Sequence, residues 1–224
     1  MIKNISNLGD SALYCDFGTE VNKQINSEVI KYFNTIKEKN IKGINNLTPS
    51  YNKLIISYDL RVTNFIEIKD KIEKLNIIET VKMKNKNLEI PVCCDGSFSL
   101  DMKRLEKKLN LTQEDILSNF FDKEFFCYMT GFVAGMPFLG DLEEKMRAQR
   151  LETPRVKVPK GSIGLTEQFA NIYTFESPGG WNIIGNTPMD VFDSLKENDP
   201  NLINPGDVVI FKQITIEKYN NYNE

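Results

Sequence analysis

The sequence predicts an α+β protein of two domains, residues 1–89 and residues 90–224. Three observations support this prediction. Apolar periodicity follows the order strand, helix, strand, strand, helix, strand in the first domain. Proline and glycine become dense from Ile90-Pro91 onward. Short apolar runs separated by turn residues then continue to about residue 213, a pattern typical of a β-barrel or sandwich.

The first domain opens with a strand and a long amphipathic helix. Apolar and polar residues alternate over Leu13–Phe17, as in a strand with one buried face. Apolar residues then recur every three or four positions to about Lys39, which predicts a helix. Its buried stripe consists of Val21, Ile25, Val29, Phe33 and Ile36.

Two strands, a second helix and a last strand complete this domain. We expect strands over Gly43–Leu47 and Lys53–Tyr58, and a helix capped by Thr63 or Asn64. A final strand is expected over residues 78–83. The order is that of the ferredoxin-like split βαβ arrangement, βαββαβ. No polar cluster or glycine loop indicates catalysis here, so a docking or structural role is expected.

The second domain is expected to hold two short helices and many short strands. One helix lies within Leu100–Leu109, and Thr112 followed by Asp115 is a helix-start pattern. The expected strands are Glu124–Thr130, Arg155–Val158, Ser162–Leu165, Asn171–Phe175, Asn182–Asn186 and Val208–Gln213. The polar tail after Ile216 is expected to fray.

Composition excludes several classes of function. The net charge is −3, from 28 basic and 31 acidic residues, which argues against nucleic acid as a partner. No run approaches the roughly 18 apolar residues of a membrane helix, and the N-terminus has no signal-peptide pattern. We expect a cytoplasmic protein whose four cysteines are reduced, since no CxxC spacing occurs.

The chain contains no histidine. This absence removes Ser-His-Asp and Cys-His catalysis and any zinc site built on histidine. Proton transfer would have to use other side chains or water. No metal ligands are predicted.

Three stretches could carry chemistry, and each has an ordinary structural alternative. The glycines of residues 131–140 could present amides to an anion or form a buried turn. Arg155 and Lys157 share one strand face, where they could grip an anion or meet solvent. The double glycine of residues 177–181 could cup an oxyanion, and Trp181 could be a core anchor or a stacking platform.

Four ordered motifs support a family resemblance. They are GFVAGMPFLGDL from Gly131, TPRVKVPKGSIGL from Thr153, SPGGWNIIGNTP from Ser177 and PGDVVIF from Pro205. The opening GDSALYCDFG also fits. The chain therefore resembles the family of the 5-oxoprolinase B subunit, allophanate hydrolase subunit 1 and the sporulation kinase inhibitors, which contain a carboxyltransferase domain of the subdomain C/D type.

The resemblance implies a fold and a function. The expected fold is a ferredoxin-like N-terminal domain and a cyclophilin-like C-terminal β-barrel. The expected function is that of one component of an ATP-dependent 5-oxoprolinase, a hydrolase that converts 5-oxoproline to glutamate. ATP with Mg²⁺ and no prosthetic group is expected, together with a sister C subunit of the carboxyltransferase type and a TIM-barrel A subunit. Phosphorylation would make the poorly electrophilic lactam reactive.

Two alternatives stay open. The chain could be a binding module that inhibits a histidine kinase without catalysis, or an allophanate hydrolase subunit 1. The module is favoured by departures from the family pattern. Phe120 stands where the family has His, and Phe169-Ala170-Asn171 replaces a QTG triplet. Asn186 replaces Arg, and Ala134 replaces Pro.

The sequence thus nominates a set of site residues. The residues nominated for catalysis are Arg155, Lys157 and Ser177. The residues nominated for substrate or anion binding are Gly131, Gly135, Lys160, Gly161, Ser162, Glu176, Gly179, Gly180 and Trp181.

Overall fold

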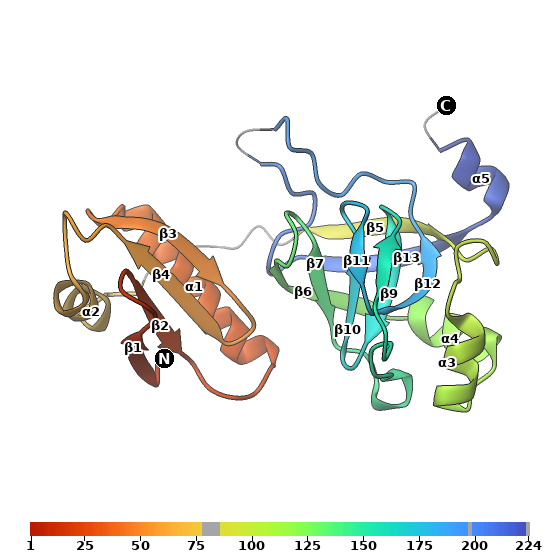
Figure 1. The fold of residues 1–224 in the computed structure, drawn as a ribbon, viewed down its shortest axis with the longest axis horizontal. Coiled ribbons are helices and arrows are strands. Elements are labelled where there is room, and N and C mark those ends of the chain that lie inside the picture. The colour runs from red at the N-terminus through yellow and green to blue at the C-terminus, as the bar shows by residue number, and fades with distance from the viewer. Residues whose placement is uncertain (78–85, 197–198, 223–224) are drawn as a thin grey trace. The chain divides into compact units, whose positions relative to one another are not determined.

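The computed structural model describes residues 1–77, 86–196 and 199–222. The chain divides into two compact units, Met1–Lys84 and Asn85–Glu224, and each is described by itself (Figure 1). The expected boundary between residues 89 and 90 falls inside strand β5 (Asn87–Cys93), which belongs to the second unit.

The first unit is an antiparallel sheet with two helices packed against it. The described strands lie in the order β1-β2-β4-β3. Their bounds are β1 Asn4–Asn7, β2 Ala12–Asp16, β3 Ile44–Pro49 and β4 Lys53–Tyr58. Helices α1 (Lys23–Lys39) and α2 (Phe65–Glu73) bury Val29, Ile36, Ile68 and Ile72 in the same core as the sheet.

Most of the predicted elements of this unit are confirmed. Asn64, rather than Thr63, caps α2, because its side chain accepts a hydrogen bond from the Glu67 amide. The strand expected over residues 78–83 lies outside the described residues. Sequence analysis missed β1, a polar four-residue strand in which only Ile5 is buried.

The second unit contains a closed barrel. In the described residues seven strands follow one another in the order β10-β7-β6-β13-β5-β12-β9 (Figure 1). The bounds not yet given are β6 Glu124–Thr130, β7 Pro137–Gly140, β9 Ser162–Thr166, β10 Phe169–Ile172, β12 Asn182–Asn186 and β13 Val208–Ile214. The β13–β5 pair is parallel, and the other neighbouring pairs are antiparallel.

Helix α4 (Gln113–Phe121) packs against β13 and contributes Ile116 and Phe120 to the barrel core. Thr112 caps it in a reciprocal capping box with Asp115, as predicted. Phe120 is fully buried, with its ring centroid 4.8 Å from that of Phe211 and 5.1 Å from that of Phe125. Phe120, at the position where the resemblance led us to expect a histidine, is therefore part of the apolar core.

Two further α-helices, α3 and α5, and one 3-10 turn belong to the second unit in the described residues. Helix α3 (Met102–Leu109) precedes α4, and a 3-10 turn, η1 (Glu144–Met146), follows β7. The tail forms a capped helix, α5 (Ile216–Asn220), where fraying was expected. The reason is a side-chain contact: the Tyr219 hydroxyl donates to Asn186 Oδ1 at 2.8 Å.

A two-stranded ribbon lies outside the barrel. It pairs β8 (Arg155–Val158) with β11 (Ser177–Gly179), so that Gly179 lies opposite Arg155. The expected strand over Asn171–Phe175 is shifted, because β10 begins at Phe169 and ends at Ile172. Strands β5, β7 and β11 were not predicted.

The buried thiols give a testable expectation. All four cysteines are free and buried, and burial raises the pKa of Cys15 and of Cys94 to about 12. At pH 8 these two thiols are ionised to roughly one part in ten thousand, so they react very slowly as nucleophiles. Titration of the native protein with 5,5′-dithiobis(2-nitrobenzoate) should show slow labelling, and the same protein in denaturant should label at once. Rapid labelling of the native protein would contradict the structure.

Candidate functional site

A small pocket lies on the outer wall of the barrel. Ala170 and Ile172 of β10 are in the core, so the alternation of a strand turns Phe169 and Asn171 outward. The pocket has a volume of about 90 Å³. Its walls are formed by Phe132, Met136, Phe138, Arg150, Asn171, Tyr173, Gly179, Gly180 and Trp181.

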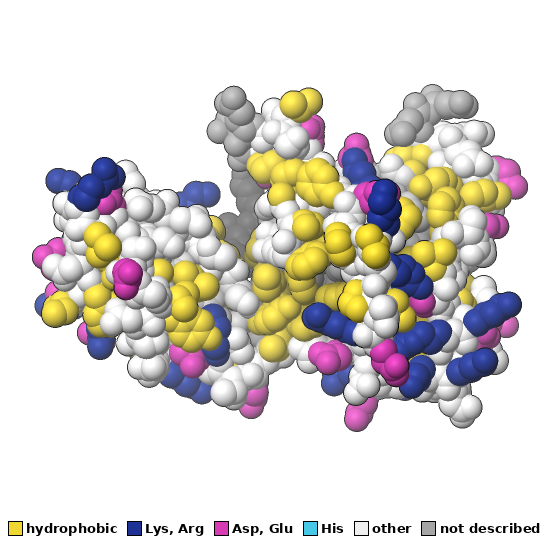
Figure 2. All heavy atoms as spheres, viewed as in Figure 1, with side chains coloured by type: hydrophobic (Ala, Val, Ile, Leu, Met, Phe, Trp, Pro, Cys, Tyr) yellow, Lys and Arg dark blue, Asp and Glu magenta, His cyan; other side chains and the backbone are white. Residues whose placement is uncertain are grey.

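Aromatic rings form much of the wall. The rings of Phe138 and Trp181 meet edge to face, with centroids 5.5 Å apart. Trp181 is 6% exposed, so it is a packed wall and not a free platform. Phe132 is 72% exposed on the glycine loop, where its φ of +71° is unusual for a bulky residue. Figure 2 shows apolar side chains gathered over the face where β7, β10 and β11 lie.

Gly179 allows the ribbon to approach Tyr173 closely. A Cβ on Gly179 would collide with the Tyr173 hydroxyl, so only glycine fits at this position. Burial is the main cause that raises the pKa of Tyr173. A hydrogen bond with Asn171, the Trp181 amide and the charges of Arg150 and Arg155 oppose that shift. The hydroxyl is therefore a neutral group at physiological pH.

Asn171 brings a buried carboxamide to the pocket. Its side-chain nitrogen donates to the Met136 sulfur at 3.3 Å, and the residue is 1% exposed. Its Oδ1 is buried and has no hydrogen-bond partner. This oxygen faces Gly164 on the neighbouring strand, where a Cβ would come within 2.5 Å of it, so it is packed inside the sheet and is not presented to the pocket.

Arg150 provides the positive charge among the residues that line the pocket. Its position is fixed by the backbone, because the Leu151 amide donates to the Gly180 carbonyl at 2.7 Å. Its own carbonyl accepts from Arg104 at 3.3 Å. The side chain remains exposed. Sequence analysis missed Arg150 because no spacing or motif marks it.

Arg155 forms a buried ion pair instead of lining the pocket. Its Nη2 lies 2.6 Å from Asp101 Oδ1, and Asp101 is 4% exposed. Asp101 Oδ2 accepts from the Ile183 amide at 2.7 Å. The pair therefore fastens the start of α3 to β12 and to the ribbon. Arg155 Nη1 is buried without a partner.

The nominated lysines form surface ion pairs outside the pocket. Lys157 Nζ lies 2.9 Å from Glu176, and that hydrogen bond raises the pKa of Lys157. Lys160 Nζ lies 2.6 Å from Asp190. All four side chains are more than half exposed, so these pairs are weak and solvated.

The nominated glycine amides are engaged within the backbone. The Gly131 amide donates to the Met136 carbonyl at 3.0 Å, and the Gly161 amide donates to the Tyr173 carbonyl at 2.7 Å. Gly135, at a φ of +69°, packs against the Phe192 ring. The amides of Gly131 and Gly161 are thus not available to an anion, whereas Gly179 and Gly180 do line the pocket.

Ser177 and Ser162 also lie away from the pocket. Ser177 Oγ is buried without a hydrogen-bond partner, on the strand that leads to Gly179. Ser162 is buried on β9, where its Oγ lies 3.5 Å from the Asn186 side-chain nitrogen. The two glycine-rich stretches do meet at one pocket, through Phe132 and Met136 from the first and residues 179–181 from the second.

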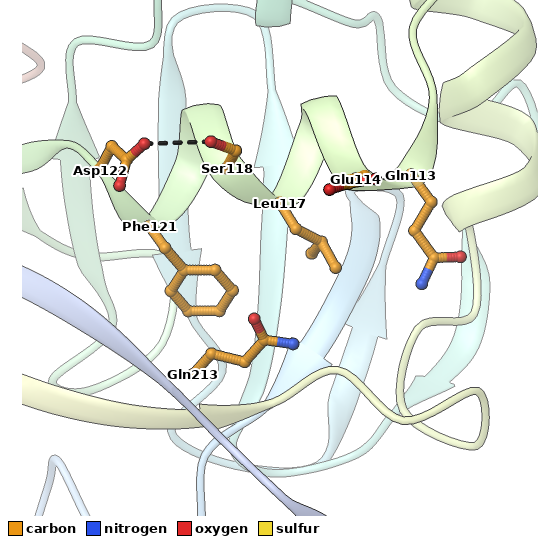
Figure 3. A pocket seen from close by; sticks show the side chains of 7 residues that line it. All are labelled: Gln113, Glu114, Leu117, Ser118, Phe121, Asp122 and Gln213. Atoms are coloured by element: carbon orange, nitrogen blue, oxygen red, sulfur yellow. Dashed lines mark hydrogen bonds between the residues drawn. The ribbon is translucent and has the colours of Figure 1, made fainter.

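A larger hollow lies along α4 (Figure 3). Its volume is about 590 Å³, and its lining is Gln113, Glu114, Leu117, Ser118, Phe121, Asp122 and Gln213. The Ser118 hydroxyl pairs with Asp122 at 3.0 Å. None of the nominated residues lies there, and its carboxylates do not suit an anion. The pocket of the outer wall is therefore the better candidate site.

The described residues hold neither a metal-binding cluster nor a membrane-spanning helix. Within residues 1–77, 86–196 and 199–222, no three side chains of the metal-binding types cluster together. In the same part of the chain, no helix has the length and apolar character needed to cross a bilayer.

Comparison with known proteins identifies the family. The family described as carboxyltransferase domain, subdomain C and D, matches residues 3–203. The chain belongs to this family. The resemblance indicated by the four motifs is thereby confirmed.

Two relatives are named as the B subunit of 5-oxoprolinase. The protein of Bacillus subtilis is 33% identical over 98% of this chain and 96% of its own length. The protein of Haemophilus influenzae is 30% identical over 93% of this chain and 96% of its own length.

Solved structures share the fold. TTHA0988 matches with a TM-score of 0.81 and 27% identity over 92% of this chain, and this chain spans only 40% of that protein. The urea carboxylase of Kluyveromyces lactis matches with a TM-score of 0.80 at 18% identity, over 96% of this chain and 22% of its own. At 18% identity, the match to urea carboxylase shows only that the fold is shared.

The Asp101–Arg155 pair gives a stability prediction. Asp101→Ala leaves a guanidinium without its partner and removes the acceptor of the Ile183 amide, so we expect a loss of about 3 kcal/mol in unfolding free energy. Asp190→Ala breaks the exposed pair with Lys160 and should cost less than about 1 kcal/mol. Urea denaturation measures both. Equal losses would show that Arg155 is not held as described.

Proposed function

We propose that the chain is the B-type component of an ATP-dependent 5-oxoprolinase and that its outer-wall pocket takes the lactam ring. The proposal is supported by relatives of that name across nearly the whole chain. The observation that carries it is a pocket that joins aromatic walls and one arginine. These groups suit a small flat ring that also bears a carboxylate.

The size of the pocket limits what it can hold. At about 90 Å³, the pocket is smaller than most pockets that take small-molecule ligands. A five-membered ring can enter, with its carboxylate left at the mouth beside Arg150. Nucleotide-sized ligands need pockets in the range of roughly 300–1,000 Å³. The residues of this pocket therefore do not fit ATP.

We propose that ATP and its Mg²⁺ bind elsewhere in the complex, on the carboxyltransferase-type sister subunit or the TIM-barrel subunit. The role of this chain is then to bind and orient the lactam and to exclude water. The proposed complex works in the cytoplasm, where free thiols such as these four remain reduced. We also propose a ferredoxin-like class for the first unit and a cyclophilin-like class for the barrel.

A second candidate is a non-catalytic module that binds a histidine kinase. It is favoured by the pairing of Arg155, Lys157 and Lys160, since none of these cations is left for chemistry. The exposed Phe132 and Val156 would then contact the partner protein. Capture of a kinase by a chain that does not support lactam turnover would favour this candidate.

Reconstitution tests the first candidate. The chain is co-expressed with its carboxyltransferase-type and TIM-barrel partners, and ATP-dependent release of glutamate from 5-oxoproline is measured. We expect Arg150→Gln to lower kcat/KM about 10-fold, because one charge-assisted hydrogen bond to the carboxylate is lost. Arg61→Gln, which changes an exposed arginine of the first unit paired with Asp59, is the matched control and should leave the rate unchanged. If the complex with Arg150→Gln turns over 5-oxoproline as fast as wild type, this pocket is not the lactam site.

A further inference from the structure

We propose that Arg104 and Asn182 act together as a brace that positions Arg150 at the mouth of the pocket. Arg104 lies on α3 and Asn182 on β12, and both contact the backbone of residues 149–151. That Arg150 meets the carboxylate of a lactam rests on the proposed function. The brace itself rests on contacts within the chain that do not depend on the ligand.

The segment that carries Arg150 is held at three consecutive residues. Asn182 Nδ2 donates to the Gln149 carbonyl at 3.1 Å. Arg104 Nη2 donates to the Arg150 carbonyl at 3.3 Å. The amide of the next residue donates to the Gly180 carbonyl at 2.7 Å. Two of these three contacts come from side chains, so two single substitutions can release the segment without changing its own sequence.

Asn182 is a buried polar residue whose carboxamide has protein partners at both ends. It is 0% exposed, and its Nδ2 also donates to the Leu165 carbonyl at 3.0 Å. Its Oδ1 accepts a hydrogen bond from Arg104 Nη1. A buried polar network that is satisfied in this way holds one geometry. An apolar side chain at this position could fill the space but could not hold the Gln149 carbonyl.

Arg104 completes the brace because a guanidinium is a planar fork with several donors. Nη1 reaches Asn182 and Nη2 reaches the Arg150 carbonyl, so one side chain ties β12 to the segment beside the pocket. Arg104 follows Asp101 by three residues, a spacing that places both on one side of a helix. Since Asp101 accepts from the Ile183 amide, α3 is fixed to β12 at two points and gives the brace a firm support.

The position of the backbone matters because the Arg150 side chain is exposed. An arginine pairs well with a carboxylate only in a narrow range of positions, and here that range is set by the backbone from which the side chain extends. Release of the segment would weaken binding of an anionic ligand in the ground state and the transition state alike. Such a loss raises KM and leaves kcat unchanged.

Hydrogen exchange of the full chain, followed by NMR, tests the brace directly. Arg104→Lys keeps the charge, but one ammonium group does not replace the fork, so the Leu151 amide should exchange at least 10-fold faster than in wild type. Arg147→Lys is the matched control. It makes the same change in the same segment, at a residue that donates to the Leu142 carbonyl and does not line the pocket, and should leave that rate unchanged.

An unchanged exchange rate in Arg104→Lys, with a melting curve that shows a folded protein, would overturn the inference. Asn182→Ala tests whether the two residues act as a unit. The Leu151 amide should again exchange at least 10-fold faster, and adding Arg104→Lys should give no further increase. Increases that multiply in the double variant would indicate two independent contacts and contradict the brace. If Asn182→Ala does not fold, Arg104→Lys decides alone.

Steady-state kinetics of the assembled complex test the positioning role. Arg104→Lys should raise the KM for 5-oxoproline about 5-fold with kcat within 2-fold of wild type, and Arg147→Lys should change neither. A complex that turns over with an unchanged KM in Arg104→Lys overturns the positioning role. A complex that releases no glutamate with ATP overturns the proposed function instead, and exchange of the Leu151 amide then decides whether the brace exists.

Discussion

The close approach of Gly179 to the Tyr173 hydroxyl is the constraint on which the pocket depends. No side chain fits between them, so the ribbon of β8 and β11 can lie directly over β10. The hydrogen bond from the Leu151 amide to the Gly180 carbonyl then brings Arg150 to the same place. A bulkier residue at position 179 would lift the ribbon and separate the aromatic walls from the buried carboxamide.

The barrel gives this arrangement a rigid base. Its inward residues form one continuous apolar core, and Phe138 of β7 with Phe169 and Asn171 of β10 face the outer layer. The ion pair of Asp101 and Arg155 holds the outer layer to that base at a second point. Arg155, which the sequence nominated for catalysis, therefore has a structural role. Arg150 lines the pocket instead.

The elements that could be predicted from the sequence are those whose signal is local. Strands with clear alternation, such as β2 and β4, and helices with caps, such as α4 after Thr112, were predicted because the signal lies within a few residues. Strands β7 and β11 were not predicted, because proline and glycine interrupt their apolar alternation. Their partner strands are also distant in the sequence. Gly179, Gly180 and Trp181 were nominated by their motif. Asn171 was noted only as a departure, since its neighbours Phe138 and Gly164 are set by sheet register.

The parallel ladder between β5 and β13 has a consequence for how the protein is made. Strand β13 lies between β5 and β6, so it closes the cylinder only when residues 208–214 have left the ribosome. Until then the edges of β5 and β6 both carry unpaired backbone groups, and such open edges recruit other chains. The barrel therefore cannot close until most of the second unit has been synthesised, and its open edges are exposed to aggregation during that interval.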